Sequence, residues 1–550
     1  MLTSNLGTGL KGCIQGEVYS DSKTLEKYSR DASLLMVRPE VVVHPKNADD
    51  VKRIVSYVLE HKKANPALSI TGRSAGTDMG GGPLNESIIL DFTTHFKFEK
   101  VDIENLTAIV EPGVFYRDFE VDTLPKHISL PVYPASKQLA ALGGMIMNNA
   151  AGEKTLRYGQ VREFVDSVSM VLGDGNEYTF GKLNKSELLE KMAQQDFEGE
   201  IYRNMFDLVS KNDAVIKNAQ PKTSKNSAGY ALWHIWNKEK ETFDLSKLFV
   251  GSQGTLGLLT KAKIRLIKDP QHKQLIALFF KSWDDLPHVV NAVLPFGPES
   301  MEAFDSTTLK LGMRFMPEIA KKVGEGLLRF ASRFIPEFFI GMKMLGLPKL
   351  VVLVQLAEES AEVLNKKIAG IQGILKKFPV HVRLPKEGLD SEKYWIMRRE
   401  SFSLLRSHVH GKQTAPFIDD FAINPDKMPE FLPKLLKILK DNGIKANIAG
   451  HAGNGNYHII PLMDLTQESE RAKIVPVSKK VYELIIQYGG TITAEHNDGI
   501  IRTPFIEQMF GHEVYGLFIK TKRIFDPQNI FNPGKKVGGT IEYMESHIAK

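Results

Sequence analysis

Cysteine is almost absent from this chain of 550 residues, and its scarcity restricts the chemistry of the chain. The one cysteine, Cys13, has no partner in the sequence, so intrachain disulfides, thiolate zinc sites and cysteine-held iron–sulfur clusters are excluded. An electron carrier on this chain therefore needs other ligands or has to be a bound organic cofactor.

Long apolar runs are also missing from the first 36 residues, where none follows a group of basic residues. We expect neither a secretory signal nor a transmembrane helix, and a cytoplasmic protein by default. Hydrophobic residues make up 42% and charged residues 25% of the composition, which indicates a folded chain and not a disordered one. A chain of this length can bury two or three cores.

Most of the net charge of +6 comes from one segment. Residues 310–349 contain eight Lys or Arg and three Glu, and "LLRFASRFIPEFFIGMKMLGLP" within them interleaves basic and apolar residues. This pattern is typical of a helix on an anionic membrane surface, and would make the protein peripheral on the inner face of the membrane. A helical insertion that packs its apolar stripe on its own domain also explains it. The continuous aliphatic surface argues against nucleic acid as a partner.

The N-terminal half alternates short strands and helices. Residues 39–64 predict a strand, a Pro-Lys-Asn turn and a helix that is capped near Asn47, with Asp49 and Asp50 in its first turn. The glycine-rich loop "GRSAGTDMGGG" follows, and a strand at 88–91 closes it.

Dense glycines let backbone N–H groups turn towards a phosphate. A strand follows this loop where the usual dinucleotide fingerprint has a helix, so for the loop alone a ligand-free surface loop remains an alternative. Two more clusters of small residues occur at 143–159 and 249–266. We expect all three loops to lie between apolar strands, an arrangement that suits an extended ligand between two sheets.

Two histidines flank a turn of glycine and asparagine in "KANIAGHAGNGNYHIIPL". A hairpin here would bring His451 close to His458, and an imidazole pair with a carboxylate such as Glu495 suits zinc or another divalent ion. A structural histidine pair is the alternative for the hairpin alone. We expect a short apolar strand before Glu495, with Glu495 and His496 pointing in opposite directions and serving different purposes.

Together these motifs resemble a known family. "GRSAGTDMGGG", "ALGGMIMNNAAG…LRYG" and "VGSQGTLG" are similar to the FAD-binding domain of the vanillyl-alcohol oxidase and p-cresol methylhydroxylase superfamily. "GHAGNGNYH", "AEHNDG" and "IFDPQNIFNPGK" resemble the FAD-linked D-2-hydroxyacid dehydrogenases, which act on D-lactate, glycolate or D-2-hydroxyglutarate. The resemblance covers residues 36–537, with the motifs in the family's order.

The resemblance implies an α+β fold in three parts. These are a two-subdomain FAD-binding domain of the p-cresol methylhydroxylase type at 1–268 (core 36–268), an α+β cap with an antiparallel sheet at 269–505, and a C-terminal segment at 506–550 that returns to the FAD domain. The basic insertion, at 308–349, belongs to the cap.

The resemblance also implies which residues hold FAD. The first loop would cradle the pyrophosphate through Arg73, Ser74, Ala75, Gly76, Thr77, Gly81 and Gly82. The second would surround the flavin and its ribityl chain through Gly143, Gly144, Asn148, Gly152 and Tyr158, with Lys535 as a further contact. Thr77 stands where members with covalent FAD often have histidine, so a non-covalent flavin is implied.

For the reaction, the resemblance implies a metal on His451, His458 and Glu495, with His496 as the general base. Arg399, or else Arg398, would bind the substrate carboxylate, although a solvated helix face also explains that stretch. The expected activity is oxidation of a D-2-hydroxy acid, D-lactate-like, to the 2-oxo acid. Electrons would pass to a quinone, a cytochrome, or a flavoprotein or iron–sulfur partner.

Two other functions remain open at this point. The chain could be a flavin-binding subunit of a glycolate-dehydrogenase-like complex that is inactive alone, or a superfamily oxidase that acts on another alcohol. Asn454, Asn497 and Gln253 also depart from the family's pattern, which leaves the metal and the substrate open. Ile460 is apolar where D-2-hydroxyglutarate dehydrogenases have a polar residue, which favours a substrate without a distal carboxylate.

Overall fold

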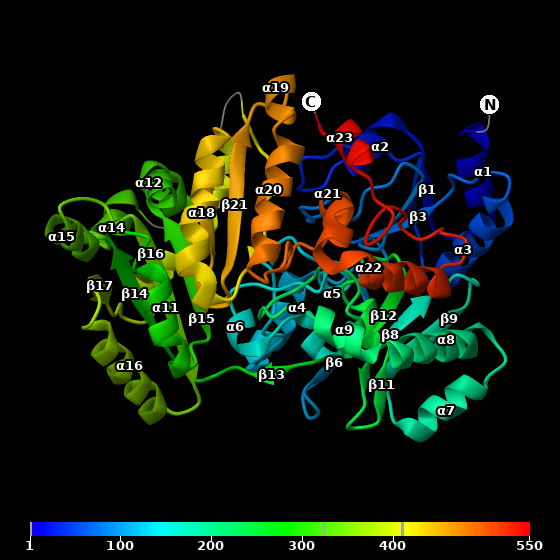
Figure 1. The fold of residues 1–550 in the computed structure, drawn as a ribbon, viewed down its shortest axis with the longest axis horizontal. Coiled ribbons are helices and arrows are strands. Elements are labelled where there is room, and N and C mark those ends of the chain that lie inside the picture. Colours follow the sequence, from blue (N-terminus) through cyan, green and yellow to red (C-terminus); the bar gives the residue numbers. More distant parts are fainter. Residues whose placement is uncertain (1–2, 323, 325, 409–411, 550) are drawn as a thin grey trace.

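A computed structural model describes residues 3–322, 324, 326–408 and 412–549 (Figure 1). Two halves lie side by side. One is built around the N-terminal sheets and the other around a large antiparallel sheet, with the C-terminal helices between and beside them. Among the described helices, none has the length and apolar character needed to cross a membrane.

A four-stranded sheet begins the first half, in the order β1-β2-β4-β3. Its strands are β1 (Glu17–Tyr19), β2 (Val41–His44), β3 (Ile70–Arg73) and β4 (Ile88–Asp91). β2, β4 and β3 are parallel, and the helix α3 (Ala48–Lys62) between β2 and β3 packs its apolar side on them. The expected cap of this helix is confirmed, because the Asn47 side chain accepts a hydrogen bond from the Asp50 backbone N–H.

A seven-stranded antiparallel sheet completes this half, in the order β10-β11-β9-β8-β12-β6-β5. Its strands are β5 (Glu99–Asp102), β6 (Thr107–Val110), β8 (Val165–Val171), β9 (Glu177–Leu183), β10 (Trp236–Asn237), β11 (Thr242–Asp244) and β12 (Leu258–Arg265). Helix α7 (Lys185–Ala193) packs beside β9 and β11, and α8 (Phe197–Lys211) places Tyr202 against Phe180 of β9 and Phe243 of β11. A two-stranded sheet pairs β7 (Ile128–Ser129) with β13 (Ile267–Lys268).

The second half confirms the expected antiparallel sheet. Its strands are β14 (His272–Phe280), β15 (Ser300–Asp305), β16 (Leu350–Glu358), β17 (Val380–Arg383), β18 (Gln413–Thr414), β19 (Phe421–Ala422), β20 (Ala446–His451) and β21 (Asn456–Met463). Alternate residues of β14 face opposite sides, as a strand requires. Ile276 and Leu278 pack towards α11 (Leu286–Val293), α16 (Ala361–Leu375) and α18 (Met428–Asp441).

The other face of this sheet is covered by the segment of residues 306–344 and by α17 (Leu389–His408). Leu275, Ala277 and Phe279 pack there with Tyr394 and Met344. The basic segment is helical and forms α12 (Ser306–Arg314), α13 (Met316–Lys322), α14 (Leu327–Ser332) and α15 (Ile335–Met344). These helices form the outer end of the second half (Figure 1).

After α22 (Ile506–Phe525), the C-terminal segment runs back to the first half. Phe531 forms a parallel bridge with Ile70 of β3, and the Asn532 side chain donates a hydrogen bond to the Gly82 carbonyl. The remaining α-helices are α1 (Thr3–Cys13), α2 (Ser22–Tyr28), α4 (Tyr116–Thr123), α5 (Leu142–Asn148), α6 (Thr155–Tyr158), α9 (Asp213–Ala219), α10 (Ser246–Phe249), α19 (Glu468–Arg471), α20 (Ile474–Gln487), α21 (Gly499–Arg502) and α23 (Ile541–Ser546).

Two local expectations are wrong. The second and third clusters of small residues do not lie between strands, because α5 forms inside the second and α10 precedes the third. No strand lies directly before Glu495 in the described structure. In that stretch Thr491 makes only an isolated bridge with Ala422. Residues 492–498 instead form bends and irregular backbone, so strand alternation does not separate Glu495 from His496.

Gly455 in the β20–β21 turn gives a test of this fold. Its φ is +61°, and a Cβ would lie 1.8 Å from the Ile423 carbonyl oxygen. Gly443 has a φ of +65° with no atom within 4 Å of the same position. We expect Gly443→Ala to destabilise by about 1–2 kcal/mol from backbone strain alone, and Gly455→Ala by clearly more. Equal free energies of unfolding for the two variants in urea would contradict the described turn.

Candidate active site

The hairpin of β20 and β21 brings the two predicted histidines together. Its register pairs His451 with Asn456 and Ala449 with His458. The imidazole rings of His451 and His458 lie with centroids 5.4 Å apart. The predicted hairpin is therefore confirmed, and it places both rings at one end of the sheet.

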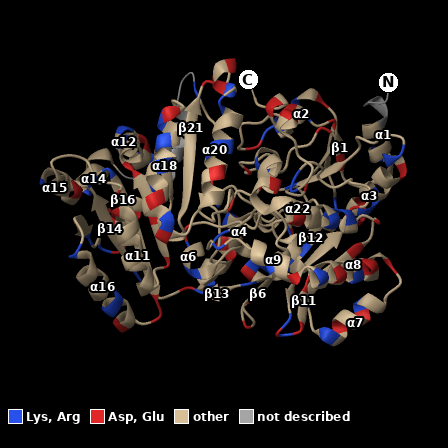
Figure 2. Ribbon diagram, viewed as in Figure 1, with Lys and Arg blue, Asp and Glu red and all other residues tan. Residues whose placement is uncertain are grey.

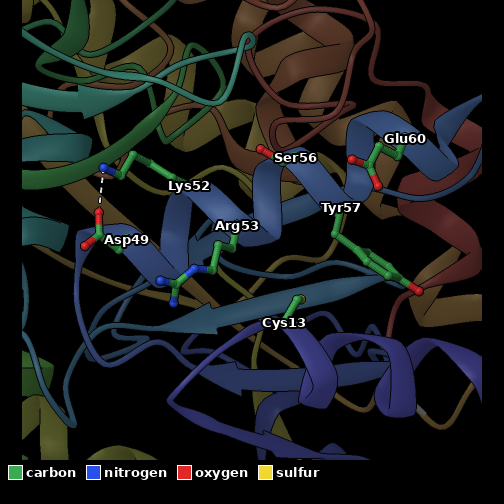
Figure 3. Close-up of a pocket in the computed structure, with 7 residues that line it drawn as sticks. All are labelled: Cys13, Asp49, Lys52, Arg53, Ser56, Tyr57 and Glu60. Carbon is green, nitrogen blue, oxygen red and sulfur yellow. Dashed lines mark ion pairs between the residues drawn. The ribbon is translucent and has the colours of Figure 1, made fainter.

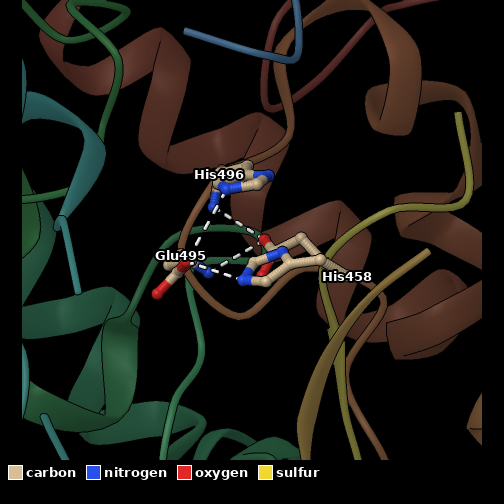
Figure 4. Close-up of side chains that lie close together, drawn as sticks. His458, Glu495 and His496 are labelled. Atoms are coloured by element: carbon tan, nitrogen blue, oxygen red, sulfur yellow. Dashed lines mark hydrogen bonds and ion pairs between the residues drawn. The ribbon is translucent and has the colours of Figure 1, made fainter. Parts of the chain in front are cut away.

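Glu495 lies beside His458 and His496 (Figure 4), and one of its oxygens faces three histidines. Its Oε1 atom is 3.4 Å from Nε2 of His451, 3.2 Å from Nε2 of His458 and 3.6 Å from Nε2 of His496. The rings of His458 and His496 stack with centroids 5.0 Å apart. The residues predicted as metal ligands and as base therefore form one cluster, and His496 points into it and not away from it.

Two buried carboxylates orient the three imidazoles. Asp419 lies 3.1 Å from Nδ1 of His458 and 3.0 Å from Nδ1 of His496, while Glu302 lies 2.6 Å from Nδ1 of His451. Each ring thus turns Nδ1 outward and Nε2 inward. Carboxylates placed in this way fix the tautomer and direction of metal-binding histidines.

Asp420 holds the loop that carries Glu495. Its Oδ2 accepts hydrogen bonds from the backbone N–H groups of Ala494, Glu495 and His496 at 3.0, 2.9 and 2.6 Å. Although this carboxylate is close enough to share a metal with His458, Glu495 and His496, three backbone donors and Thr493 already occupy that oxygen. We assign Asp420 to loop geometry.

Lys225 is a buried cation that the sequence patterns did not indicate. Its Nζ lies 3.1 Å from Glu495 Oε2 and also donates to Asn456 Oδ1 at 3.1 Å and to the Gly152 carbonyl at 3.3 Å. One oxygen of Glu495 therefore faces the histidines and the other faces Lys225. Because Gly152 belongs to the second predicted FAD loop, Lys225 joins that loop to the histidine cluster.

The charges of the cluster shift its pKa values strongly. Burial disfavours charge on His458, but Asp419 and Glu495 outweigh it and raise the pKa of the imidazole to about 10. Burial also opposes charge on Glu495, yet Lys225 and His451 hold its pKa well below the usual range. The centre is thus built around ionised carboxylates, which attract a cation.

The structure gives the two arginines different surroundings. Arg398 on α17 forms an ion pair with Glu302 at 2.5 Å, so its guanidinium supports the carboxylate that orients His451. The Arg398 Nε atom has no hydrogen-bond partner among the described residues. The side chain of Arg399 lies outside the described part, and its contact with a substrate carboxylate stays a prediction.

The first predicted FAD loop borders a hollow of about 330 Å³. Arg73, Ser74, Ala75 and Thr77 line it, together with the cationic side chains of Lys27 and Arg117. In the part of the chain that the structure describes, the backbone N–H groups of Ala75, Gly76 and Thr77 have no acceptor on the protein. Free N–H groups beside cations fit a pyrophosphate.

The other residues predicted to bind FAD lie on neighbouring elements. Gly143, Gly144 and Asn148 are in α5, and Gly152 lies so close to the next segment that a Cβ would be 2.0 Å from the Tyr133 carbonyl oxygen. Tyr158 ends α6 and donates to Glu299 at 3.4 Å. Lys535 is buried and donates to the Leu84 carbonyl at 2.8 Å, two residues beyond Gly82. Gly81 lies in the first loop, where its N–H donates to Asp31.

Two of the residues that depart from the family's pattern link the FAD loops to the loop of Glu495. Asn497 Nδ2 donates to the carbonyls of Asn148 and Gly251, and Gln253 Oε1 accepts from the Gly499 N–H. Asn454 Nδ2 instead donates to Ser224 at 2.8 Å. The side chains of Asn497 and Gln253 therefore serve to join the loops.

A separate and larger hollow, of about 470 Å³, lies between α1 and α3 (Figure 3). It is lined by Cys13, Lys52, Arg53, Tyr57 and neighbours, none of which belongs to the predicted sites. It is open to solvent, and its two cations, Lys52 and Arg53, already pair with Asp49 and Asp50. Size therefore does not identify the site, whereas the convergence of side chains does.

Known protein families match this chain in two parts. A family described as "FAD binding domain" matches residues 39–181, and one described as "FAD linked oxidases, C-terminal domain" matches residues 269–536. The chain belongs to the FAD-linked oxidases. The resemblance that the motifs indicated is confirmed, and FAD is its cofactor.

Three curated relatives have similar sequences. The D-2-hydroxyglutarate dehydrogenase of Pseudomonas putida is 26% identical over 95% of this chain and 50% of its own length. The D-lactate dehydrogenase of Archaeoglobus fulgidus is 27% identical over 90% of this chain and 91% of its own, and glycolate oxidase subunit GlcD of Bacillus subtilis is 26% identical over 92% and 91%. This chain spans about half the length of the first relatives it matches.

Solved structures confirm the fold. The 4-ethylphenol oxidase from Gulosibacter chungangensis superposes with a TM-score of 0.69 at 15% identity and covers 98% of each chain. A p-cresol methylhydroxylase superposes with a TM-score of 0.66 at 16% identity and covers 96% of this chain and 94% of its own. The expected α+β fold of the p-cresol methylhydroxylase type is therefore correct.

A carboxylate introduced into the hollow tests the FAD assignment. Ala75→Asp places a carboxylate beside the free N–H groups, and we expect it to repel the pyrophosphate and lower bound FAD at least about 10-fold. The exposed Ala64→Asp, in the turn after α3, is the matched control and should keep FAD. The ratio of absorbance at 450 and 280 nm measures both. Full FAD content in Ala75→Asp, with native folding, would contradict the assignment.

Proposed function

We propose that this protein oxidises a D-2-hydroxy acid to the 2-oxo acid with FAD as the hydride acceptor. The observation that carries the proposal is the convergence of three imidazole Nε2 atoms on Glu495, in a cluster linked by hydrogen bonds to the FAD loops. Relatives named D-2-hydroxyglutarate dehydrogenase and D-lactate dehydrogenase support the same class of substrate.

The cluster also fits a divalent metal. His451, His458 and Glu495 offer two nitrogens and one oxygen, the donor set of a site that keeps open positions for a substrate. Zinc is the ion that we propose. When bound, it polarises the substrate hydroxyl and lowers its pKa.

His496 has the place of a general base. Its Nε2 faces the cluster and its Nδ1 faces Asp419, so the ring is fixed while Nε2 accepts the proton of the substrate hydroxyl. FAD, held by the loops described above, would supply the acceptor for the hydride from C2. Arg398 or Arg399 orients the substrate carboxylate, and the flavin is held without a covalent bond because Thr77 offers no imidazole.

A small, D-lactate-like acid is the substrate that we propose within this class. Ile460 lies two residues after His458 on β21, so both side chains lie on the same face of the strand. Its apolar side chain offers no hydrogen bond to a second carboxylate. D-2-Hydroxyglutarate and glycolate are the competing substrates.

Flavin reduction tests the activity. We expect D-lactate to bleach the flavin absorbance near 450 nm under anaerobic conditions with zinc present, and L-lactate to leave it unchanged. D-2-Hydroxyglutarate should bleach it more slowly, and treatment with a chelator should abolish the reaction. An absence of bleaching with every D-2-hydroxy acid would refute the proposal, while a better response to D-2-hydroxyglutarate would correct only the substrate.

Asp419→Asn tests the metal site separately from FAD. The substitution keeps the size of the side chain but weakens the hold on His458 and His496, and we expect zinc affinity to fall about 10–100-fold while FAD content stays unchanged. The half-buried Asp464, in the loop directly after β21, provides the matched control, Asp464→Asn. Competition with a chromogenic chelator gives both affinities. Unchanged affinity in Asp419→Asn would overturn the role of this carboxylate.

The electron acceptor is part of the same proposal. These 550 residues contain a single cysteine, so they cannot themselves hold an iron–sulfur centre on cysteine ligands. We propose a quinone, a cytochrome, or a flavoprotein or iron–sulfur partner as the acceptor.

A rival function is that of a subunit of a glycolate-oxidising complex that is inactive alone. The similarity to GlcD favours it. The bleaching experiment on the isolated chain separates the two.

A further inference from the structure

The outward side of α15 exposes a continuous apolar stripe. Ile335, Phe338, Phe339 and Met342 follow the i, i+3, i+4, i+7 spacing of one helix face. Their exposed fractions are 53%, 66%, 56% and 59%, although side chains of this kind are usually buried. The helix therefore presents an unpartnered apolar face to the outside.

The inward side of α15 fixes this orientation. Ile340 and Met344 pack into the cluster formed by the sheet strands β14 and β16. Glu337 forms ion pairs with Arg383 on β17 and with Lys393 on α17. The helix cannot rotate its apolar stripe inward without breaking these buried contacts.

Neighbouring residues extend the stripe, and we call the whole set the outer face. It consists of the exposed residues Leu327, Leu328, Ile335, Phe338, Phe339, Met342, Leu345 and Leu347. Leu328 and Leu345 are 87% and 94% exposed. Eight large apolar side chains on two short helices and their connections exceed the scattered apolar exposure of an ordinary surface.

Cations accompany the outer face. The exposed Lys and Arg residues of the same helical segment are Lys310, Arg314, Lys321, Arg329, Lys343 and Lys349. Among the described residues from 310 to 349, Glu318 is the one exposed acid, and Glu337 is engaged in the ion pairs above. Figure 2 shows the Lys and Arg of these helices at the free end of the molecule, opposite the N-terminal half.

We propose that the outer face docks on the surface of an anionic lipid bilayer. Apolar side chains enter the boundary between headgroups and acyl chains, and the flanking cations pair with lipid phosphates. A second copy of the chain fits less well, because a two-fold interface brings like patches together and would place these cations opposite each other. The inference stands apart from the substrate, since none of these residues belongs to the histidine cluster or to the FAD loops.

Vesicle binding tests the proposal with the full FAD-loaded chain. We expect co-sedimentation with vesicles of phosphatidylglycerol and phosphatidylcholine, weaker binding at high salt, and none above background with phosphatidylcholine alone. Phe338→Ser combined with Phe339→Ser should weaken binding at least about 10-fold, because each substitution removes a phenyl ring that would be buried in the bilayer. The control pair Val121→Ser and Leu189→Ser, exposed at 70% and 58% in the other half, should bind as the parent chain does.

A second variant, Arg329→Glu with Lys343→Glu, tests the role of charge. Because it reverses two of the cations that would pair with lipid phosphates, it should abolish the preference for anionic vesicles. FAD content and thermal unfolding establish that each variant is folded. Absence of vesicle binding by the parent chain would overturn the proposal, as would equal losses in the control pair. A dimer in light scattering that becomes monomeric in Phe338→Ser/Phe339→Ser, without vesicle binding, would assign the outer face to a second copy.

Discussion

The buried carboxylate of Glu495 is the group on which the rest of the site depends. A carboxylate removed from water is stable only when charges and hydrogen bonds replace the lost hydration, and here Lys225 meets one oxygen while three imidazoles meet the other. Each imidazole then needs a partner on its outer nitrogen. Asp419 and Glu302 supply it, and Arg398 in turn balances Glu302. Carboxylates and nitrogen-bearing side chains thus alternate outward from Glu495.

Hydrogen bonds around Glu495 also connect the FAD loops to the histidine cluster. Lys225 touches Glu495 and the carbonyl of Gly152, and Asn497, next to His496, bonds to the carbonyls of Asn148 and Gly251. Direct hydrogen bonds therefore join the FAD loops to the loop that carries Glu495 and His496. Asn497 adopts a φ of +64° there, a conformation that asparagine tolerates better than most residues. Asparagine is therefore tolerated at this position, and its side chain joins the two loops by hydrogen bonds.

Sequence patterns predicted the parts of the site that local rules govern. The cap of α3 and the hairpin that joins His451 to His458 follow from residues within a few positions of each other, and both are confirmed. Lys225, Glu302 and Asp419 were not predicted, because they meet their partners over 270, 149 and 39 residues of chain. The expected strand before Glu495 is wrong for a physical reason: Asp420 accepts the N–H groups that a neighbouring strand would otherwise have accepted.

The basic segment shows where periodicity stops being informative. Apolar residues occupy several sides of α15, so the sequence alone fits both a helix packed on its own domain and a helix on a membrane surface. The structure shows that one side packs, through Ile340 and Met344, and that the other side, through Phe338 and Met342, does not. The two interpretations are therefore compatible, because a helix must be anchored on one side to present a fixed apolar face on the other. Ion pairs of Glu337 with Arg383 and Lys393 provide that anchor, which makes the exposure of Phe338 and Met342 a property of the fold and not of a loosely held helix.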